Sequence, residues 1–399
     1  MTARLEGSVG GRVPGTDEWI DVSYRDGVVV TIARRGLTAE EAVVAPVIAP
    51  GFVDAQVNGY DGLDVNAAEP SPDRIVELTR RLAGIGVTTW TPTIVTASED
   101  AIVAGLGAIA EARRLDRRTA DAVPDVHLEG PFISDREGAR GVHDAAVVRP
   151  IDPAEVERWL DVGAPIGIVT VSPHTPDAAA RIAEVAALGV RVAIGHTHAT
   201  PEQIRAAVDA GATLSTHLGN GIAAELPRHP NALWTQLADD RLTAGFIGDG
   251  HHLPLDTVEV LLRAKTTARA FLVSDMTDVA GRAPGSYDAS VGGRVELSDD
   301  GRLSFADTGY LAGSGVDIAR ALRTVVAGTS LDLASALPLV TSTPAGVLSH
   351  ARAGLGQIAV GAPADLVLLD ERSGEVLRVV QGGREVMGVL AGAGRGGSP

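Results

Sequence analysis

Hydrophobic positions follow two alternating patterns from about residue 50 onward. Short apolar runs rich in β-branched residues are typical of buried strands, and Ala- and Leu-rich stretches with apolar residues every three or four positions are typical of helices. Strands are predicted at Gly51–Ala55, Thr88–Ile94, Asp125–Leu128, Ile166–Val171, Val190–Gly195, Ala212–Thr216, Leu242–Ile247 and Ala270–Ser274, and helices between them include Pro72–Ala83, Ala101–Arg114 and Pro201–Ala210. Eight such units predict an α/β fold, a (β/α)8 TIM barrel, whose catalytic groups lie at the carboxyl ends of the strands.

Two parts of the chain interrupt this rhythm. Within residues 281–310, Arg294–Leu297 and Leu303–Phe305 flank the turn residues 299–301 and predict a β-hairpin inserted after the eighth strand. Strand-like runs near the chain ends are Val28–Ala33, Val43–Ile48, Ala364–Leu369, Val376–Val380 and Arg384–Val386. We expect residues 1–48 and 352–399 to form a small β-sandwich domain beside a barrel of residues 49–351, with a flexible tail at 392–399.

Composition narrows the classes of protein that fit. The chain has 399 residues, 45% of them hydrophobic, which is enough for a large core. It has no cysteine, no apolar run of the ~18–20 residues that a bilayer requires, and no apolar stretch typical of a secretion signal near residue 1. We therefore expect a cytoplasmic protein without a membrane partner. The net charge of −17 argues against binding to nucleic acid, although one arginine and a few amides suffice for a single phosphate.

Polar residues gather where the predicted strands end. Glu129 ends the third strand, His196 follows the fifth, His217 the sixth, and Asp275 the eighth. In a barrel these ends meet at one rim. Two imidazoles and one carboxylate suit zinc, which activates water and polarises a carbonyl. The sequence therefore predicts a metal site at Glu129, His196 and His217.

Each of these residues also has an ordinary structural interpretation. A buried histidine in a strand is usually a hydrogen-bonded core residue, and we expect this of His127, beside the ligand set rather than in it. Asp275 alone would suit a helix N-cap. His198 lies on the same strand face as His196, and its role is left open. The joint placement of the residues, not any one of them, favours the metal site.

The string APGFVDAQVNG resembles the start of the first barrel strand in the amidohydrolase superfamily. Within that superfamily, the N-acetylglucosamine-6-phosphate deacetylases are resembled by five further strings together: HLEGPFIS, IGHTHAT, THLGN, GDGHH and SDMTDVAG. The string GLGQIAVGAPADLVLLD is similar to the superfamily's sandwich-domain ending. The resemblance implies that Glu129, His196 and His217 are metal ligands and that Asp275 is the catalytic acid and base. Gln56 and Asn58 stand where many members have a His-x-His pair. One divalent ion is therefore expected, Zn2+ first, with Fe2+, Mn2+ or Co2+ as alternatives.

The resemblance also extends to the substrate. It implies that His143 is a catalytic residue that contacts the sugar and the scissile carbonyl. The matching substrate-binding positions are Asn220, Gly221, Arg228, His252, Leu311, Ala312 and Gly313. Arg228 matches an arginine that, in related enzymes, reaches the phosphate in the neighbouring subunit, which implies a homodimer.

Departures from the family pattern concentrate at the ligand end. Gly219 stands in place of a bulky residue, and residues 229–231 replace the usual acidic and Pro-Gly segment. His174 and His198 occupy positions where other residues are common, and the pattern assigns no role to these two, to His229 or to His251. The family pattern therefore specifies the reaction more closely than it specifies the substrate.

The expected reaction is hydrolysis of the N-acetyl amide of an amino-sugar phosphate, N-acetylglucosamine 6-phosphate first, with release of acetate. In this mechanism Asp275 takes a proton from water and returns it to the amine, and His143 stabilises the oxyanion. The nearer alternative is an amidohydrolase of an unphosphorylated N-acetyl sugar, another acetamido sugar phosphate or a cyclic amide. The further alternative is a non-catalytic metal-binding protein. Asp275 argues against it, since structural zinc sites are closed by a fourth ligand.

Overall fold

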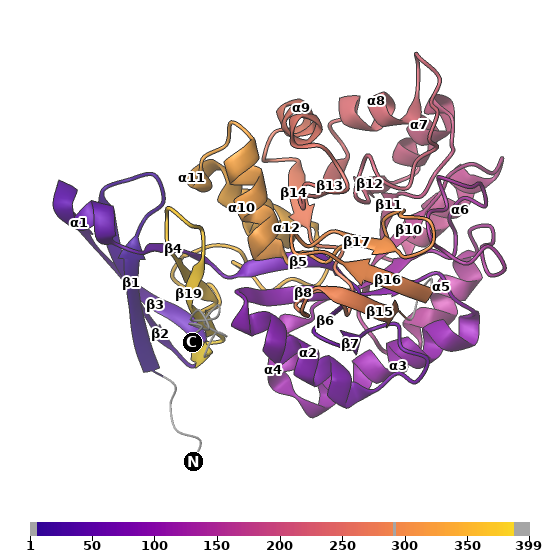
Figure 1. Ribbon diagram of the computed structural model, residues 1–399. Helices are drawn as coiled ribbons and strands as arrows, with labels where there is room; N and C mark the ends of the chain where they lie inside the picture. The colour runs from indigo at the N-terminus through magenta and orange to yellow at the C-terminus, as the bar shows by residue number, and fades with distance from the viewer. Residues whose placement is uncertain (1–5, 290–292, 387–399) are drawn as a thin grey trace, which may run out of the picture.

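A computed structural model describes residues 6–289 and 293–386 of the protein, so the tail predicted at 392–399 lies outside the described residues. Its centre is a ring of parallel strands (Figure 1). These are β5 (Phe52–Val57), β8 (Val87–Val95), β9 (Val126–Glu129), β10 (Ile166–Val171), β11 (Arg191–Ile194), β12 (Ala212–Ser215), β13 (Thr243–Ile247) and β14 (Ala270–Val273). A parallel bridge between Val57 and Met276 brings the last strand back to the first. The predicted eight-stranded barrel is confirmed, with every strand within a few residues of its expected place.

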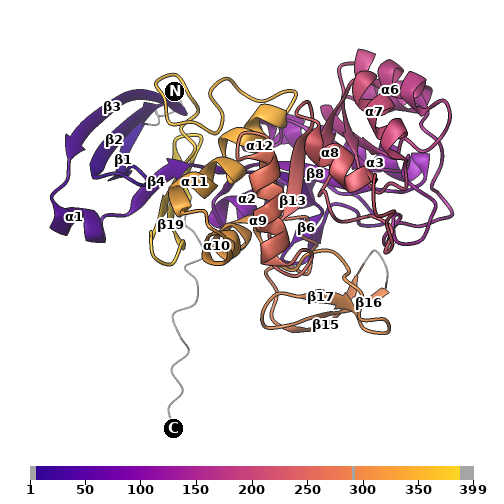
Figure 2. The same cartoon turned by 90° about the horizontal axis from the view of Figure 1, so that it is seen from above.

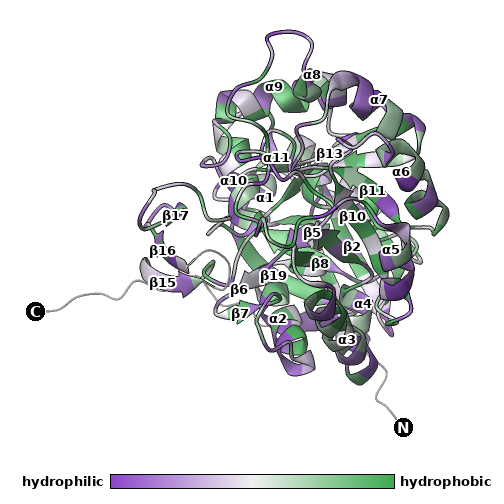
Figure 3. Ribbon diagram, turned by 90° about the vertical axis from the view of Figure 1, so that its right-hand side faces the viewer, coloured by the Kyte–Doolittle hydropathy of each residue, from purple (hydrophilic) through white to green (hydrophobic). Residues whose placement is uncertain are grey.

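Helices cover the outside of the barrel and turn their apolar faces to the strands (Figure 3). They are α2 (Pro72–Gly84), α3 (Glu99–Leu115), α5 (Pro153–Leu160), α6 (Ala178–Ala187), α7 (Pro201–Asp209), α8 (Ala232–Ala238), α9 (Leu255–Lys265) and α10 (Ile318–Gly328). Shorter helices are α4 (Arg117–Ala122), α11 (Leu333–Ala336) and α12 (Ser342–Val347). Inside the ring, Val53, Ile168, Leu214 and Phe271 belong to a second apolar cluster. Burial of each such side chain stabilises the barrel by about 1.5–3 kcal/mol, which holds the strand ends in fixed positions.

Both chain ends contribute to one separate sheet, seen on the left of Figure 1. Its seven strands run in the order β20 (Arg384–Val386), β19 (Val376–Gln381), β18 (Leu366–Leu369), β4 (Val47–Pro50), β1 (Glu6–Arg12), β2 (Glu18–Arg25) and β3 (Val28–Gly36). The amide of Val29 donates to the carbonyl of Ala362 at 2.9 Å, so the sheet bends back on itself around a shared core. The expected sandwich is thus a single curled sheet. We propose the domain limits expected from the sequence, residues 1–48 and 352–399 for this domain and residues 49–351 for the barrel.

Two expected strands differ in the structure. Residues 43–44 belong to helix α1 (Ala39–Val44), because Thr38 and Glu41 form a capping box at its start, and only 47–48 of the predicted strand enter β4. The predicted hairpin gains a third strand: β15 (Gly285–Ala289) pairs with β16 (Gly293–Leu297), which pairs with β17 (Leu303–Phe305). Figure 2 shows this sheet projecting from the barrel. In the described part of the chain, no helix combines the length and apolarity needed to cross a bilayer.

Candidate active site

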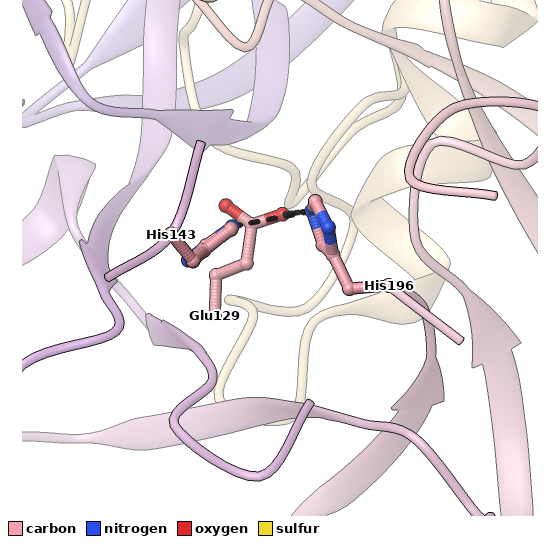
Figure 4. A group of neighbouring side chains, drawn as sticks. All are labelled: Glu129, His143 and His196. Carbon is pink, nitrogen blue, oxygen red and sulfur yellow. Dashed lines mark hydrogen bonds and ion pairs between the residues drawn. The ribbon is translucent and has the colours of Figure 1, made fainter. Parts of the chain in front are cut away.

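The three predicted metal ligands converge at the carboxyl end of the barrel. Glu129 is the last residue of β9, while His196 and His217 each stand two residues beyond β11 and β12. The Glu129 Oε1 atom lies 2.8 Å from Nε2 of His217 and 3.2 Å from Nε2 of His196. All three side chains are buried. Figure 4 shows the Glu129 and His196 side chains turned toward each other, with His143 beside them.

The backbone at these strand ends adopts an unusual conformation. His196, His217 and Asp275 have φ angles of 45°, 25° and 50°, in the left-handed region. Each such residue costs about 1–3 kcal/mol and persists only where the surrounding structure holds it. Gly221, also left-handed at φ 57°, packs so closely that a Cβ there would lie 2.7 Å from Nδ1 of His196. Three of the six non-glycine residues with positive φ in the described part of the chain therefore lie at the site that the sequence predicts.

The hydrogen bonds of His196 determine which of its nitrogens carries the proton. Its Nδ1 lies 3.0 Å from the carbonyl oxygen of Ala139, which can only accept, so Nδ1 is the donor. The other nitrogen, Nε2, faces the Glu129 carboxylate 3.2 Å away. At that separation the two groups can share either a proton or a metal ion. The donor set therefore fits a divalent ion.

The electrostatics of Glu129 and His217 favour positive charge at the same place. Burial by itself raises the pKa of Glu129, but hydrogen bonds from His196 and His217 outweigh it and lower that pKa well below its usual value. Burial likewise opposes charge on His217, yet its bond to Glu129 raises the pKa of the imidazole. Carboxylate and imidazoles thus form a buried pocket of negative potential, as a cation site requires.

His143 lies closer to the ligands than a purely substrate-contacting residue would. Its ligand atom and those of Glu129 and His196 all lie within 4.8 Å of one another. Burial, and then His196, lower the pKa of His143 to about 3, so the ring is neutral. Its Nε2 is 3.3 Å from Nε2 of His196, and when that nitrogen carries no proton His143 is the donor through its own Nε2. The proton of His143 then points into the centre.

Asp275 is tied to the centre by two side-chain amides. Gln56 Nε2 donates to Oε1 of Glu129 at 3.0 Å and to Oδ1 of Asp275 at 3.1 Å, and Asn58 Nδ2 donates to the same Oδ1 at 2.8 Å. Burial, and then the charge of Glu129, raise the pKa of Asp275 to about 6. Gln56 and Asn58 therefore act as donors to the two carboxylates, in the positions where a second metal would need ligands.

The predicted substrate residues divide into two groups. Around the centre, the amide of Asn220 donates to the carbonyl of His217 at 2.9 Å, and the strip Leu311, Ala312 and Gly313 leads directly into Ser314, whose amide donates to the carbonyl of Asp275 at 3.3 Å. The charge of His252 acts on the Asp275 carboxyl, so that side chain is also near. Arg228 is exposed and has no hydrogen bond or ion pair to any residue in the described part of the chain. The described residues thus offer the Arg228 guanidinium no partner.

Comparison with known proteins agrees with this geometry. The profile described as the amidohydrolase family matches residues 47–386. The chain belongs to the amidohydrolase family. This amidohydrolase is 31% identical to an N-acetylgalactosamine-6-phosphate deacetylase of Escherichia coli O157:H7, over 88% of this chain and 92% of that protein. It is 32% identical to an N-acetylglucosamine-6-phosphate deacetylase of Bos taurus, over 82% of this chain and 80% of that protein.

A solved structure is similar as well. An aspartate-to-alanine variant of the N-acetyl-D-glucosamine-6-phosphate deacetylase of Mycobacterium smegmatis, in complex with N-acetyl-D-glucosamine-6-phosphate, superposes with a TM-score of 0.81. Sequence identity is 30%, and the match covers 92% of this chain and 94% of that one. The resemblance of this amidohydrolase to the deacetylases, based on its sequence motifs, is thereby confirmed.

Some residues that support the amidohydrolase site were not singled out in the sequence. Asp249 accepts from Nδ1 of His252 at 2.7 Å and orients that ring, and its place in the GDGHH string was the available signal. Buried Asp54 accepts from the amide of Ser274 at 3.1 Å and so holds the strand that leads to Asp275. The Ala139 carbonyl that orients His196 is a backbone atom, and nothing in the side-chain pattern marks it.

The other histidines named in the sequence analysis lie in different places. His127 donates to or accepts from Thr170 Oγ1 at 2.7 Å, and burial lowers its pKa to about 4, so it is the core residue that we expected. Nε2 of His251 lies 3.1 Å from the carbonyl of Asp300 and fastens the β16–β17 turn. His229 is exposed. His174 and His198 lie next to each other, with ring centroids 4.4 Å apart.

Proposed function

We propose that this amidohydrolase removes the acetyl group from N-acetylglucosamine 6-phosphate, giving glucosamine 6-phosphate and acetate. The observation that carries the proposal is the placement of Asp275 against a Glu129–His196–His217 centre, held by amides that donate to both carboxylates. A carboxylate base beside a cation site is what hydrolysis of an unactivated amide requires. The similar deacetylases from three organisms support the choice of an acetamido sugar phosphate.

Glu129, His196 and His217 would hold one divalent ion, and the mixed nitrogen and oxygen donor set suits Zn2+ first, with Fe2+, Mn2+ or Co2+ as alternatives. When bound, such an ion supplies a water with a pKa near ~7 and polarises the amide carbonyl. Gln56 and Asn58 already donate to carboxylates, which supports a single ion at this centre. Metal analysis of the purified chain tests this, and a metal coordinated by Gln56 or Asn58 would contradict it.

Asp275 and His143 carry the proton chemistry in this proposal. Both amides bind Oδ1 of Asp275, and no hydrogen bond in the described part of the chain engages Oδ2. The free Oδ2 can take the proton of the attacking water and then return it to the departing amine. His143, neutral and with its proton on Nε2, can donate to the oxygen that becomes negative as water adds to the carbonyl.

Recognition of the substrate falls to the loops around the centre. Asn220, Gly221, His252 and the strip Leu311, Ala312 and Gly313 would contact the sugar. Arg228, exposed in the single chain, would bind the phosphate in a partner subunit, so we propose a homodimer. We also propose a cytoplasmic location, which the cysteine-free composition supports.

A turnover panel tests the proposed substrate. It compares N-acetylglucosamine and N-acetylgalactosamine, each with and without a 6-phosphate. We expect the largest kcat/KM for N-acetylglucosamine 6-phosphate. The galactosamine epimer is a specific second candidate, because the similar protein from Escherichia coli O157:H7 is named for it. A preference for either unphosphorylated sugar would contradict the proposal and favour the nearer alternative.

A further inference from the structure

A second group of metal-binding side chains lies on the barrel rim, outside the catalytic centre. Asp135 follows β9, His174 follows β10 and His198 follows β11. Their ligand atoms all lie within 4.8 Å of one another, as close together as those of Glu129, His143 and His196. Asp135 is exposed, and the two histidines are partly buried. None of these residues has a part in the proposed deacetylation, which leaves the group without a function.

Both imidazoles contact serine hydroxyls through Nδ1, which leaves their Nε2 atoms available to another partner. Nδ1 of His174 lies 2.8 Å from Oγ of Ser172, and that hydroxyl donates to Thr197 Oγ1 at 2.8 Å. Because its proton is used there, Ser172 accepts from His174, which leaves a lone pair on Nε2. Nδ1 of His198 lies 2.6 Å from Ser134 Oγ, and when that hydroxyl accepts, Nε2 of His198 also has a free lone pair. Histidines that bind metals are typically oriented through the second ring nitrogen in this manner.

The backbone around the group is also fixed. Gln203 donates from Nε2 to the carbonyl of His174 at 2.8 Å, while its Oε1 accepts from the amide of Thr200. The amide of Ser134 donates to the carbonyl of His196 at 2.9 Å. Ligands at ~2.0–2.1 Å from a tetrahedral ion stand about 3.4 Å apart, so no two of these ligand atoms have to approach each other by more than about 1.4 Å. Exposed Asp135 can make that movement by changing its rotamer.

We propose that Asp135, His174 and His198 form a second zinc site, separate from the catalytic centre. Two imidazoles and one carboxylate form a ligand set that favours zinc over calcium or magnesium. Partial exposure leaves the fourth position to water, so the ion is exchangeable rather than locked in the fold. Arg136 lies on the same loop, and its positive charge repels a bound cation. Its exposed side chain can extend into solvent, away from the site.

A zinc ion at this site adds a direct link between three loops that hydrogen bonds already connect. Asp135 and His143 belong to the same segment between β9 and α5. A bound ion ties that segment to the ends of β10 and β11, and so restricts the loop that carries His143. Amide hydrogen exchange in residues 135–143 should therefore slow when zinc is added, independently of any substrate.

Zinc counting on the full chain at pH 8 tests the site. The protein is loaded with Zn2+, freed of unbound metal by gel filtration, and analysed by mass spectrometry. We expect two equivalents in the parent, and one in the double variant His174→Gln, His198→Gln and in Asp135→Asn. Glu129→Gln should lose the other equivalent. His350→Gln, a control histidine beside Asp125 just before β9, should keep both.

Affinity separates a built site from a surface ion. Ser172→Ala removes the acceptor that orients His174, and loss of such a partner weakens metal binding by about 10–100-fold. An unchanged dissociation constant in Ser172→Ala would mean an adventitious ion only and would overturn the proposal. So would a parent with one equivalent that disappears in Glu129→Gln, or a folded double variant that keeps two. Absent deacetylase activity with two bound zinc ions would contradict the proposed function and leave this site standing.

Discussion

Asp275 presents its two carboxylate oxygens to different surroundings. Oδ1 accepts from Gln56 and Asn58, and both of these amides can still donate to a neutral side chain of the same shape. Asp275→Asn therefore keeps the volume and removes the base. We expect kcat to fall by about 10²–10⁴-fold with metal content near that of the parent, measured by turnover and metal analysis.

Asp278→Asn is the matched control, a partly buried aspartate three residues away, and should change kcat only a few-fold. Activity of Asp275→Asn within a few-fold of the parent would show that another group handles the proton. The parent should also lose kcat/KM as the pH falls through the pKa of Asp275, because only the ionised form accepts a proton. A cation at Glu129 favours that ionised form, so the loss should occur at or below about pH 6.

Gly221 illustrates how a residue without a side chain shapes the site. Gly221→Ala would place a Cβ 2.7 Å from Nδ1 of His196 and displace the ring from the Ala139 carbonyl. Strain of about 1–3 kcal/mol predicts a metal dissociation constant raised by roughly 5–150-fold, measured by titration. Gly309→Ala is the control, because Gly309 has a similar φ of 70° but nothing within 4 Å of its Cβ position. Equal effects of the two variants would refute the steric explanation.

At the level of elements, the barrel was predictable because its strands are buried on both faces and its helices are amphipathic. The strand pattern and the helix pattern differ in period, so each can be recognised in the sequence. Barrel strand β10 and hairpin strand β17 match their expected bounds residue for residue. The strand expected at 43–48 was wrong in its first half, since the capping box of Thr38 and Glu41 outweighs the β-branched pair that follows. Glycine-rich β1 and exposed β15 lack a recognisable alternation of apolar and polar residues, and pairing with neighbouring strands is what makes them strands.

Helix α7 offers a test of such local control. Thr200 accepts from the amide of Gln203, and Gln203 accepts from the amide of Thr200. Thr200→Ala should lower the free energy of unfolding by about 0.5–2 kcal/mol, measured by urea denaturation. Ser71→Ala at the start of α2 is the control, because Ser71 makes no side-chain capping bond and should lose little. A loss in Ser71→Ala as large as that in Thr200→Ala would contradict the capping explanation.

At the scale of the whole molecule, closure of the barrel is what brings Glu129, His196, His217 and Asp275 together from strands that are far apart in the sequence. Their types and spacing were enough to predict that meeting. The hydrogen bonds of Gln56 and Asn58 to the carboxylates and the contact of the Ala139 carbonyl with His196 were not, since no periodic pattern encodes such local geometry. His143 was placed at the site by the family resemblance alone. The role proposed for Arg228 depends on more than the fold of one chain, because it requires a second subunit.

Arg228→Ala measures what that exposed guanidinium contributes. Loss of a charge-assisted contact to phosphate should cost about 1.5–3 kcal/mol, or roughly 10–150-fold in kcat/KM for a 6-phosphorylated substrate, with little change for its unphosphorylated counterpart. Arg205→Ala is the control, an exposed arginine whose one ion pair within residues 6–289 and 293–386 is with Glu202, and ion pairs of that kind contribute about 0–1 kcal/mol. Equal loss on both substrates, or on neither, would reject phosphate recognition by Arg228.

Mixing two impaired variants tests whether Arg228 acts across a subunit boundary. A dimer of one Arg228→Ala chain and one Asp275→Asn chain contains one site with an intact Asp275 and, from the partner, an intact Arg228. If Arg228 acts in the neighbouring subunit, refolding the two variants together should restore about half of the parent activity in each mixed dimer. If Arg228 serves its own chain, or if sedimentation shows a monomer, the mixture should show only the summed activities of the separate variants, and the proposed dimeric site would be wrong.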